Sequence, residues 1–171
     1  MQRLLVIMTM LVGVFAAGWL SAQGSRPELT GQDYAEIEQL IAKYNQATDF
    51  EDLDMYASIF TEDAVWKREQ GGQALIGREA LVNSLSERFA TRPAEHERRH
   101  WQNNHVITAT PNGATSRVYF VSFEVSYVPP KPALSGHYDD VLVRTPEGWR
   151  IKERTLVLDQ PLRDSTFGYV W

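Results

Sequence analysis

The stretch that decides the fold is Gly136–Arg144 (GHYDDVLVR), which Thr145–Gly148 (TPEG) joins to Trp149–Arg154 (WRIKER). Two runs rich in β-branched and aromatic residues flank a short segment that contains Pro and Gly. This pattern is typical of a β-hairpin.

The first strand of this hairpin opens with four polar or aromatic side chains before it becomes apolar. Because successive side chains of a strand point to opposite faces, His137 and Asp139 share one face of the sheet. Tyr138, Asp140 and Leu142 share the other face. Either face could line a pocket.

The composition describes an ordinary globular domain. The chain has 171 residues, of which 43% are hydrophobic and 23% charged, enough for one domain with its own core. The net charge of −5 implies no basic surface, and we therefore expect no nucleic-acid partner. There is no cysteine, which excludes disulfides and thiolate chemistry.

The amino terminus is typical of a secretory signal peptide. Arg3 gives a positive start, Leu4–Leu20 is uncharged and mostly apolar, and the small residues Ser21 and Ala22 follow. We predict a signal peptide at residues 1–22 and a linker at 23–28. An uncleaved membrane anchor is the alternative, since the apolar run nearly spans a bilayer. Cleavage would give an exported protein, periplasmic or secreted, with no membrane contact.

The first half of the mature chain is helical in pattern. A capping box is indicated at Thr30–Asp33, and the apolar spacing of three and four that follows predicts an amphipathic helix with an inner face made of Tyr34, Ile37, Ile41, Tyr44 and Thr48. Asp52 can cap a second helix. Residues 63–68 predict a short strand, and a third helix follows Gly77 and stops before Pro93.

Strand patterns fill the second half. We predict strands over 100–109 and 114–128, joined by a turn at Asn112-Gly113, and then the opening hairpin. Ser122, Glu124 and Ser126 alternate with apolar residues, which suggests that one face of this strand is wet or lightly buried and could be the rim of an interface. Helices first and antiparallel strands second predict an α+β fold.

The chain resembles a known family in several short motifs. It is similar to the SnoaL-like branch of the nuclear transport factor 2-like superfamily, with scytalone dehydratase, ketosteroid isomerase and polyketide cyclases as relatives. The motifs are Tyr44–Asp49 (YNQATD), Phe60–Ala64 (FTEDA), Arg99–Asn104 (RHWQNN), Gly136–Asp140 (GHYDD) and Gly148–Ile151 (GWRI). The resemblance covers roughly residues 29–160, leaving a tail at 161–171, and implies a cone-shaped fold of helices packed on a curved, mostly antiparallel sheet.

The resemblance also implies a site. By similarity to scytalone dehydratase, Asp49, His100 and His137 are the expected catalytic residues. The residues expected to bind substrate are Tyr44, Trp66, Asn104, Phe123 and Tyr138. Thr48 stands where the dehydratase has a tyrosine, so scytalone is not implied as the substrate.

A histidine held by a carboxylate can perform general acid–base catalysis without a cofactor. Asp49 would orient His100 as the base, and His137 would act as the acid or polarise a carbonyl. We expect no metal. Asp49, His100 and His137 could form a two-histidine, one-carboxylate set, but no closely spaced ligand motif supports it.

Structural explanations stay open for the same residues. Asp49 could close the junction between two helices. His100 shares a strand face with Gln102, Asn104 and Val106, and this face could be a hydrogen-bonded network without catalysis. We expect His105 to be structural. A surface or interface network could instead be formed by Tyr138, Asp140 and Arg144 with Arg150 or Arg154.

Two functions therefore compete. The first is an exported, cofactor-independent lyase (dehydratase) or isomerase that acts on a small apolar molecule with a ketone or hydroxyl group. The second is a non-catalytic ligand-binding or assembly module. We expect the protein to form a dimer under either function.

Overall fold

The structure is a computed structural model that describes residues 28–93 and 97–159. The predicted signal peptide at residues 1–22 and the predicted tail at 161–171 lie outside the described residues, as does the predicted linker apart from Glu28. In the described ranges, none of the helices has the length and apolar character needed to cross a membrane.

The helices begin where the sequence predicts. Helix α2 (Gly31–Asp49) starts with the predicted capping box, in which the backbone N–H of Asp33 donates to Thr30 Oγ1 at 3.2 Å. Helix α3 (Leu53–Ser58) is capped by Asp52, and α4 (Arg78–Thr91) follows Gly77. One detail is wrong: Tyr34, predicted on the inner face of α2, is 42% exposed.

The strands form one six-stranded sheet in the order β2-β1-β6-β5-β4-β3. Neighbouring strands are antiparallel, except that β1 and β6 are parallel. The predicted hairpin is β5–β6, with Thr145 paired to Gly148. The strand bounds are β1 Phe60–Arg68, β2 Leu75–Ile76, β3 Arg98–Thr110, β4 Gly113–Glu124, β5 Lys131–Thr145 and β6 Gly148–Leu158.

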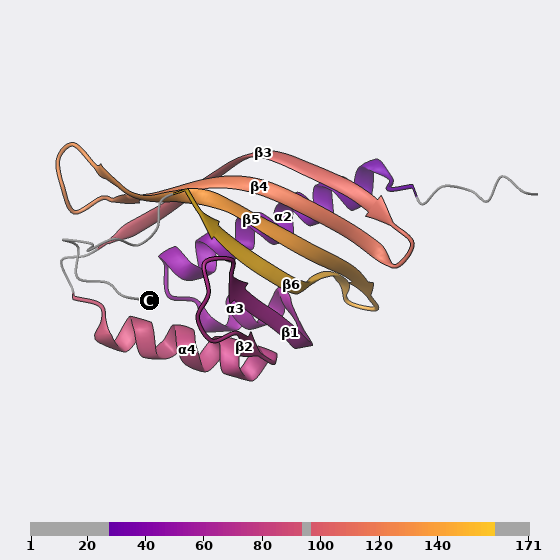
Figure 1. Ribbon diagram of the computed structural model, residues 1–171, viewed down its shortest axis with the longest axis horizontal. Coiled ribbons are helices and arrows are strands. Elements are labelled where there is room, and N and C mark those ends of the chain that lie inside the picture. Colours follow the sequence, from indigo (N-terminus) through magenta and orange to yellow (C-terminus); the bar gives the residue numbers. More distant parts are fainter. Residues whose placement is uncertain (1–27, 94–96, 160–171) are drawn as a thin grey trace, which may run out of the picture.

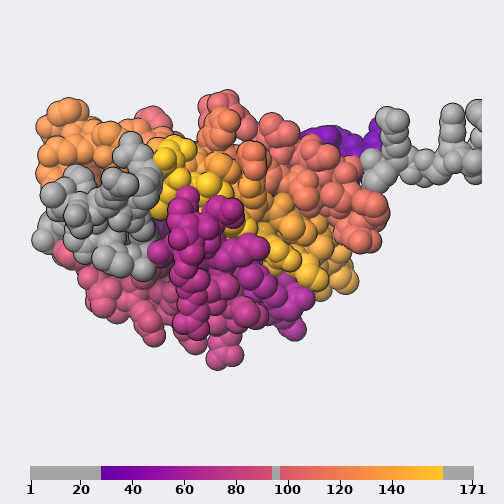
Figure 2. All heavy atoms as spheres, viewed as in Figure 1, coloured from indigo at the N-terminus to yellow at the C-terminus, as the bar shows by residue number. Residues whose placement is uncertain are grey.

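Helix α2 crosses one face of the curved sheet, and α4 lies against β1 and β2 at the far side of β6 (Figure 1). In the space-filling view, the atoms of β1, β2 and α4 form the lower part of the molecule, and atoms of β4 to β6 are visible above and to the right of them (Figure 2). We call the face under α2 the inner face and the opposite one the outer face. This arrangement is the predicted α+β fold.

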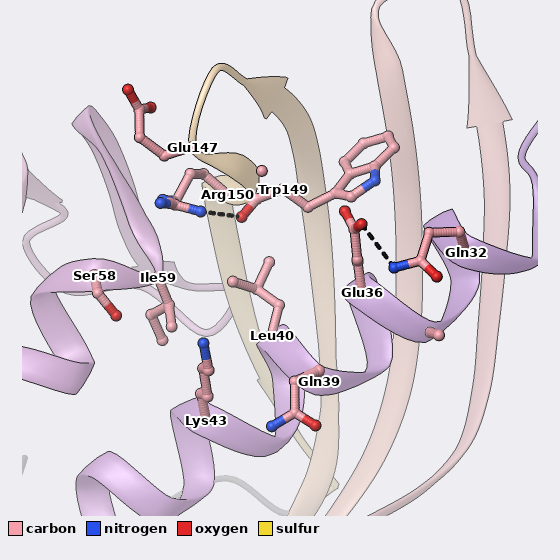
Figure 3. A pocket seen from close by; sticks show the side chains of 12 residues that line it. Gln32, Glu36, Gln39, Leu40, Lys43, Ser58, Ile59, Glu147, Trp149 and Arg150 are labelled. Carbon is pink, nitrogen blue, oxygen red and sulfur yellow. Dashed lines mark hydrogen bonds between the residues drawn. The ribbon is translucent and has the colours of Figure 1, made fainter.

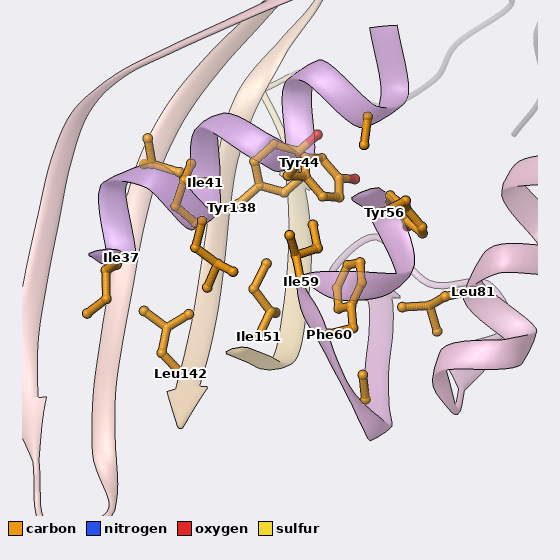
Figure 4. Packing of buried hydrophobic residues seen from close by; sticks show 14 of the residues in the cluster. Ile37, Ile41, Tyr44, Tyr56, Ile59, Phe60, Leu81, Tyr138, Leu142 and Ile151 are labelled. Carbon is orange, nitrogen blue, oxygen red and sulfur yellow. The ribbon is translucent and has the colours of Figure 1, made fainter. Parts of the chain in front are cut away.

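The core fills the space between α2 and the inner face. Tyr44 of α2 packs edge-on against Tyr138 of β5, with ring centroids 5.5 Å apart. Aliphatic side chains of both layers surround these rings (Figure 4). The buried members of this core include Ile37, Ile41, Ile59, Phe60, Leu81, Leu85, Leu142 and Ile151.

Strand β4 corrects one prediction. It ends at Glu124 instead of continuing to Val128. The sequence predicts Ser122 and Glu124 on a wet or lightly buried face, but they are fully buried, 0% and 1% exposed. Glu124 is buried because Arg98 of β3 donates to it from Nε at 2.6 Å, so that the charge is paired on the inner face.

Candidate functional site

Asp49 and His100 meet where the last residue of α2 reaches β3. The Asp49 carboxylate accepts two hydrogen bonds, from the His100 backbone N–H to Oδ2 at 2.8 Å and from the ring Nδ1 to Oδ1 at 2.5 Å. Their side chains are only 6% and 12% exposed. Because the carboxylate occupies Nδ1, Nε2 is the ring nitrogen left for chemistry.

A second bond of the same kind fixes this end of α2. Gln102, two residues further along β3, donates from Nε2 to Asn45 Oδ1 at 2.6 Å. Asn45 lies one turn before Asp49 on α2, and Gln102 lies on the same strand face as His100, so the two bonds run side by side. Together they hold the helix end and the strand in register.

A cavity of about 40 Å³ lies beside His100. This volume is close to the ~30 Å³ that one water molecule takes in the liquid. Tyr44 and Tyr138, two of the predicted substrate-binding residues, line it together with Trp66, a third. The remaining walls are Thr48, Leu85, Arg88, Arg92, Arg98, Phe120, Leu134 and Leu156.

A buried ion pair, Arg154–Asp140, packs against the rings of Tyr44 and Tyr138. Arg154 donates from Nε and Nη2 to the Asp140 carboxylate, both at 2.7 Å, and both side chains are 0% exposed. The guanidinium carbon lies 4.0 Å from the ring centroid of Tyr44 and 4.5 Å from that of Tyr138. The predicted pairing of Asp140 with Arg154 thus exists, but inside the core; Arg144 instead pairs with Asp33 and Glu36.

Electrostatics keeps these groups in single protonation states. Burial opposes the charge of Arg154, but the Asp140 carboxylate prevails and raises the pKa of Arg154 above its ordinary value. Burial raises the pKa of Tyr138 well above its ordinary value, and the neighbouring Tyr44 raises it further. Tyr138 is therefore a neutral phenol at physiological pH, and a neutral phenol can donate a hydrogen bond.

His137 does not join the other two predicted catalytic residues. It pairs with Tyr119 of β4 on the outer face, whereas the adjacent Tyr138 points into the core. Its Nε2 lies 3.6 Å from Asp139 Oδ2 on that same outer face. Because the sheet itself separates His137 from His100, the expected convergence of Asp49, His100 and His137 is wrong, and so is the metal set built from them.

Two predicted substrate-binding residues also lie elsewhere. Asn104 is exposed at a bulge in β3, with φ of +56°, and the bulge ends the simple alternation. Val106 beyond it is 63% exposed on the outer face instead of sharing the face of His100. Phe123 is on the outer face too, with its ring 4.8 Å from that of Trp101.

Sequence reasoning missed the arginines of the cavity. Arg88 of α4 and Arg92 at its carboxyl-terminal cap continue the spacing of Leu81 and Leu85, so the helical period itself could have placed them beside the cavity. Arg98 lay just before the motif that contains His100. Charged side chains are rarely assigned to an inner face, and this is why they were overlooked.

A larger groove of about 470 Å³ runs beside residues 32–43 of α2 (Figure 3). Side chains of α2 and of the β5–β6 turn line it, among them Glu36, Lys43, Glu147 and Arg150. It is open to solvent and holds no pair like Asp49–His100. We therefore place the candidate site at His100. In the described part of the chain, no group of three or more His, Asp or Glu residues could hold a metal ion.

Comparison with known proteins gives the family. The model of the SnoaL-like domain matches residues 30–155, and the chain belongs to this family. The search of curated proteins found no match.

Solved structures give the fold. A protein of unknown function with a cystatin-like fold from Nostoc punctiforme aligns with a TM-score of 0.68 at 24% identity, over 79% of this chain and 97% of that one. An NTF2-like protein from Novosphingobium aromaticivorans aligns with a TM-score of 0.67 at 23% identity, over 80% of this chain and 86% of that one. ActVI-ORFA from Streptomyces coelicolor aligns with a TM-score of 0.64 at 27% identity, over 76% of this chain and 98% of that one. These matches confirm the predicted superfamily and fold.

Proposed function

We propose that this member of the SnoaL-like family is a cofactor-independent lyase (dehydratase) or isomerase that acts on a small apolar molecule with a ketone or hydroxyl group. The observation that supports it is the Asp49–His100 pair, with Nδ1 held at 2.5 Å and the ring lining a cavity of about 40 Å³. An imidazole fixed in this way presents an acceptor at Nε2. Such a group is a general base.

The chemistry follows from the residues around that nitrogen. Nε2 of His100 removes a proton from the carbon next to the substrate carbonyl, and Asp49 stabilises the imidazolium that forms. The phenol of Tyr138 donates to the carbonyl oxygen as it becomes an enolate. The imidazolium then returns its proton to another carbon in an isomerisation, or to the departing hydroxyl in a dehydration. His137 has no part in this scheme, because it lies on the outer face.

The His100→Ala variant tests the proposal. The substrate is first found by screening β-hydroxy ketones and unsaturated ketones for a change in enone absorbance. We expect the variant to lose about a hundred- to ten-thousand-fold in turnover, since that is the usual contribution of a general base. The matched control is His137→Ala, which should keep full turnover. An active His100→Ala protein with an unchanged circular dichroism spectrum would refute the assignment and favour a binding module.

We further propose that the protein is exported and that it forms a dimer through the outer face. Export predicts a mature protein that begins at Gln23, which amino-terminal sequencing of the secreted material checks. The dimer is supported by exposed apolar side chains on three adjacent strands, Trp101 and Val106 of β3, Tyr119 of β4 and Val141 of β5.

Sedimentation equilibrium tests the dimer. The wild-type protein should be dimeric at micromolar concentration, and Trp101→Glu should make it monomeric, because a buried unpaired charge disrupts an apolar interface. Ile76→Glu is the matched control, since Ile76 is 71% exposed on the distant strand β2. A monomeric wild-type protein would contradict the proposal.

A further inference from the structure

A second cavity adjoins the one beside His100. It has a volume of about 260 Å³ and lies between α4 and the β1–β2 segment, on the side where these elements face each other in Figure 1. Trp66 and Arg88 line both cavities, so the two meet at these side chains. The cavity beside His100 has room for little more than a carbonyl group, whereas the two together reach the size of a small-ligand pocket, roughly 300 Å³. We call the larger one the distal cavity.

The charges around the two cavities are already paired. Arg98 donates to Glu124 from Nε at 2.6 Å, and Arg92 donates to Glu51 from Nη1 at 3.3 Å. Arg88 has an interaction partner as well. An anion that entered would lose its hydration and would compete with carboxylates for cations that they already hold. A neutral molecule is therefore the better fit.

Trp66 carries a hydrogen-bond donor that is not used within the fold. Its indole Nε1 is buried and has no hydrogen-bond partner among the described residues. A buried N–H without a partner destabilises a folded protein, and such groups are rare in native proteins. Arg68 lies over the same indole, with its guanidinium carbon 5.9 Å from the ring centroid, and this contact helps to position the ring. An oxygen atom of a bound molecule would satisfy the donor.

Apart from its arginines, the distal cavity has apolar and uncharged polar walls. Leu75 and Leu81 supply aliphatic surface, and Gln73 and Ser84 supply an amide and a hydroxyl. Burial raises the pKa of the Tyr56 phenol well above its ordinary value, so this side chain is also uncharged at physiological pH. A molecule with an apolar body and an oxygen acceptor matches these walls.

We propose that the distal cavity is a second subsite, which takes the apolar body of a neutral substrate, and that Trp66 Nε1 donates a hydrogen bond to a second oxygen atom of that substrate. The reacting carbonyl lies beside His100 and Tyr138, and the body lies against Leu75 and Leu81. Trp66 is then the residue that selects the substrate. This inference rests on the proposed function, because it extends the substrate site at His100, but its tests do not require turnover.

Isothermal titration calorimetry with two neutral probes tests the need for a second oxygen. 6-Acetyl-1-tetralone has two carbonyl oxygens, and in 6-isopropyl-1-tetralone a methyl group of similar size replaces the second one. Neither probe has a hydroxyl group that can leave, so binding is measured without turnover. We expect the wild-type protein to bind the diketone about tenfold more tightly, because the isopropyl group leaves the buried N–H unpaired. Equal affinity for the two probes, or no binding of either, would overturn the proposal.

A charged analogue tests the preference for a neutral molecule. 6-Carboxy-1-tetralone has nearly the shape of the diketone and is an anion at neutral pH. We expect it to bind more weakly than the diketone, since Arg92 and Arg98 are already paired. Tighter binding of the anion would refute the assignment of a neutral substrate.

The indole N–H resonances in nitrogen-15 NMR spectra locate the bound probe. Trp66→Phe identifies the Trp66 signal by its loss. Saturation with 6-acetyl-1-tetralone should shift this signal strongly, because the N–H gains an acceptor. The Trp149 signal should stay in place, since that N–H already donates to Asp33 at 3.0 Å. A shift confined to other indoles would place the probe elsewhere and refute the site.

Removing the donor tests the role of Trp66. Trp66→Phe keeps an aromatic ring but has no N–H, so the variant should bind the two neutral probes equally well. Trp101→Phe is the matched control, since Trp101 is 66% exposed on the outer face. A preference for the diketone that persists in Trp66→Phe, or that disappears in Trp101→Phe, would contradict the role of Trp66.

Filling the distal cavity tests where the body of the probe binds. Ser84→Phe places a ring in the wall of this cavity and should weaken the binding of both neutral probes by about tenfold or more, because the ring takes up their space. Ser86→Phe is the matched control, since Ser86 lies on the same helix, is exposed and lines neither cavity. Unchanged binding by a Ser84→Phe protein with the wild-type circular dichroism spectrum would refute the subsite.

The His100→Ala variant separates this inference from the proposed function. It should keep the preference for 6-acetyl-1-tetralone while turnover is lost. If it keeps both the preference and turnover, the acid–base assignment fails and the distal subsite stands. If the wild-type protein turns over ketones and does not discriminate between the two neutral probes, the proposed function stands and the distal subsite fails.

Discussion

The two ends of helix α2 each present an aspartate to the sheet, and the two aspartates have different kinds of partner. Asp33, in the first turn, accepts from the Thr30 hydroxyl at 2.7 Å and from Trp149 Nε1 at 3.0 Å, and it pairs with Arg144. Asp49, the last residue of the helix, accepts only from His100 in the hydrogen bonds described above.

The difference separates a structural role from a chemical one. The amino-terminal end of a helix favours negative charge, and the donors around Asp33 cannot lose their protons at physiological pH. Asp49 stands at the carboxyl-terminal end, where the helix dipole disfavours a negative charge. Its partner is an imidazole, the side chain that most readily exchanges protons near neutrality. An aspartate kept at an unfavourable helix end, bound to a histidine that lines a cavity, is therefore the better candidate for catalysis.

Exchanging each aspartate for asparagine gives the largest expected contrast. Asp49→Asn keeps the size of the side chain but can no longer stabilise the imidazolium of His100, so turnover should fall by about a hundredfold or more. Asp33→Asn should leave turnover unchanged and lower the melting temperature by several degrees, because it weakens the cap and the contacts to β5 and β6. Steady-state kinetics and thermal unfolding of both variants measure the two effects.

The opposite pattern would reverse our reading of α2. If Asp33→Asn reduced turnover and Asp49→Asn reduced only the melting temperature, the chemistry would lie at the groove of Figure 3 and the pair at β3 would be a structural latch.

The sequence predicted the fold well because local signals agreed with it. The capping box at Thr30, the cap at Asp52 and the turn before Gly148 each fix an element through hydrogen bonds between neighbouring residues. These signals need no knowledge of distant parts of the chain. The placement of Asp49 beside His100, two residues 51 positions apart, came only with the family resemblance.

The errors arose where the outcome depends on three-dimensional context. Alternation correctly put His137 and Tyr138 on opposite faces, but it does not say which face α2 covers. The bulge at Asn104 adds a residue to β3, and no pattern of side chains in the sequence indicates it. Glu124 seemed solvated because its partner Arg98 is 26 positions away in the sequence. Pairing across strands decides the burial of such charges.

Acid unfolding gives the smallest effect and the finest test of the contrast. The hydrogen bonds from the Thr30 side chain and backbone, followed by that from Trp149, lower the pKa of Asp33 from 3.8 to about 2. A carboxyl group with a lower pKa in the folded state stabilises the fold above its unfolded pKa, and this contribution disappears as the pH falls from about 4 to about 2. Urea unfolding of the wild-type protein should therefore show a steeper loss of stability across this interval than that of Asp33→Asn. Some loss should persist in the variant, since the pKa of Asp139 is also lowered, chiefly by the hydrogen bonds from Arg117. Parallel curves for the two proteins would mean that the Asp33 carboxylate has the same pKa in the folded and unfolded states. The structural role that we assign to Asp33, in contrast to the chemical role of Asp49, would then be wrong.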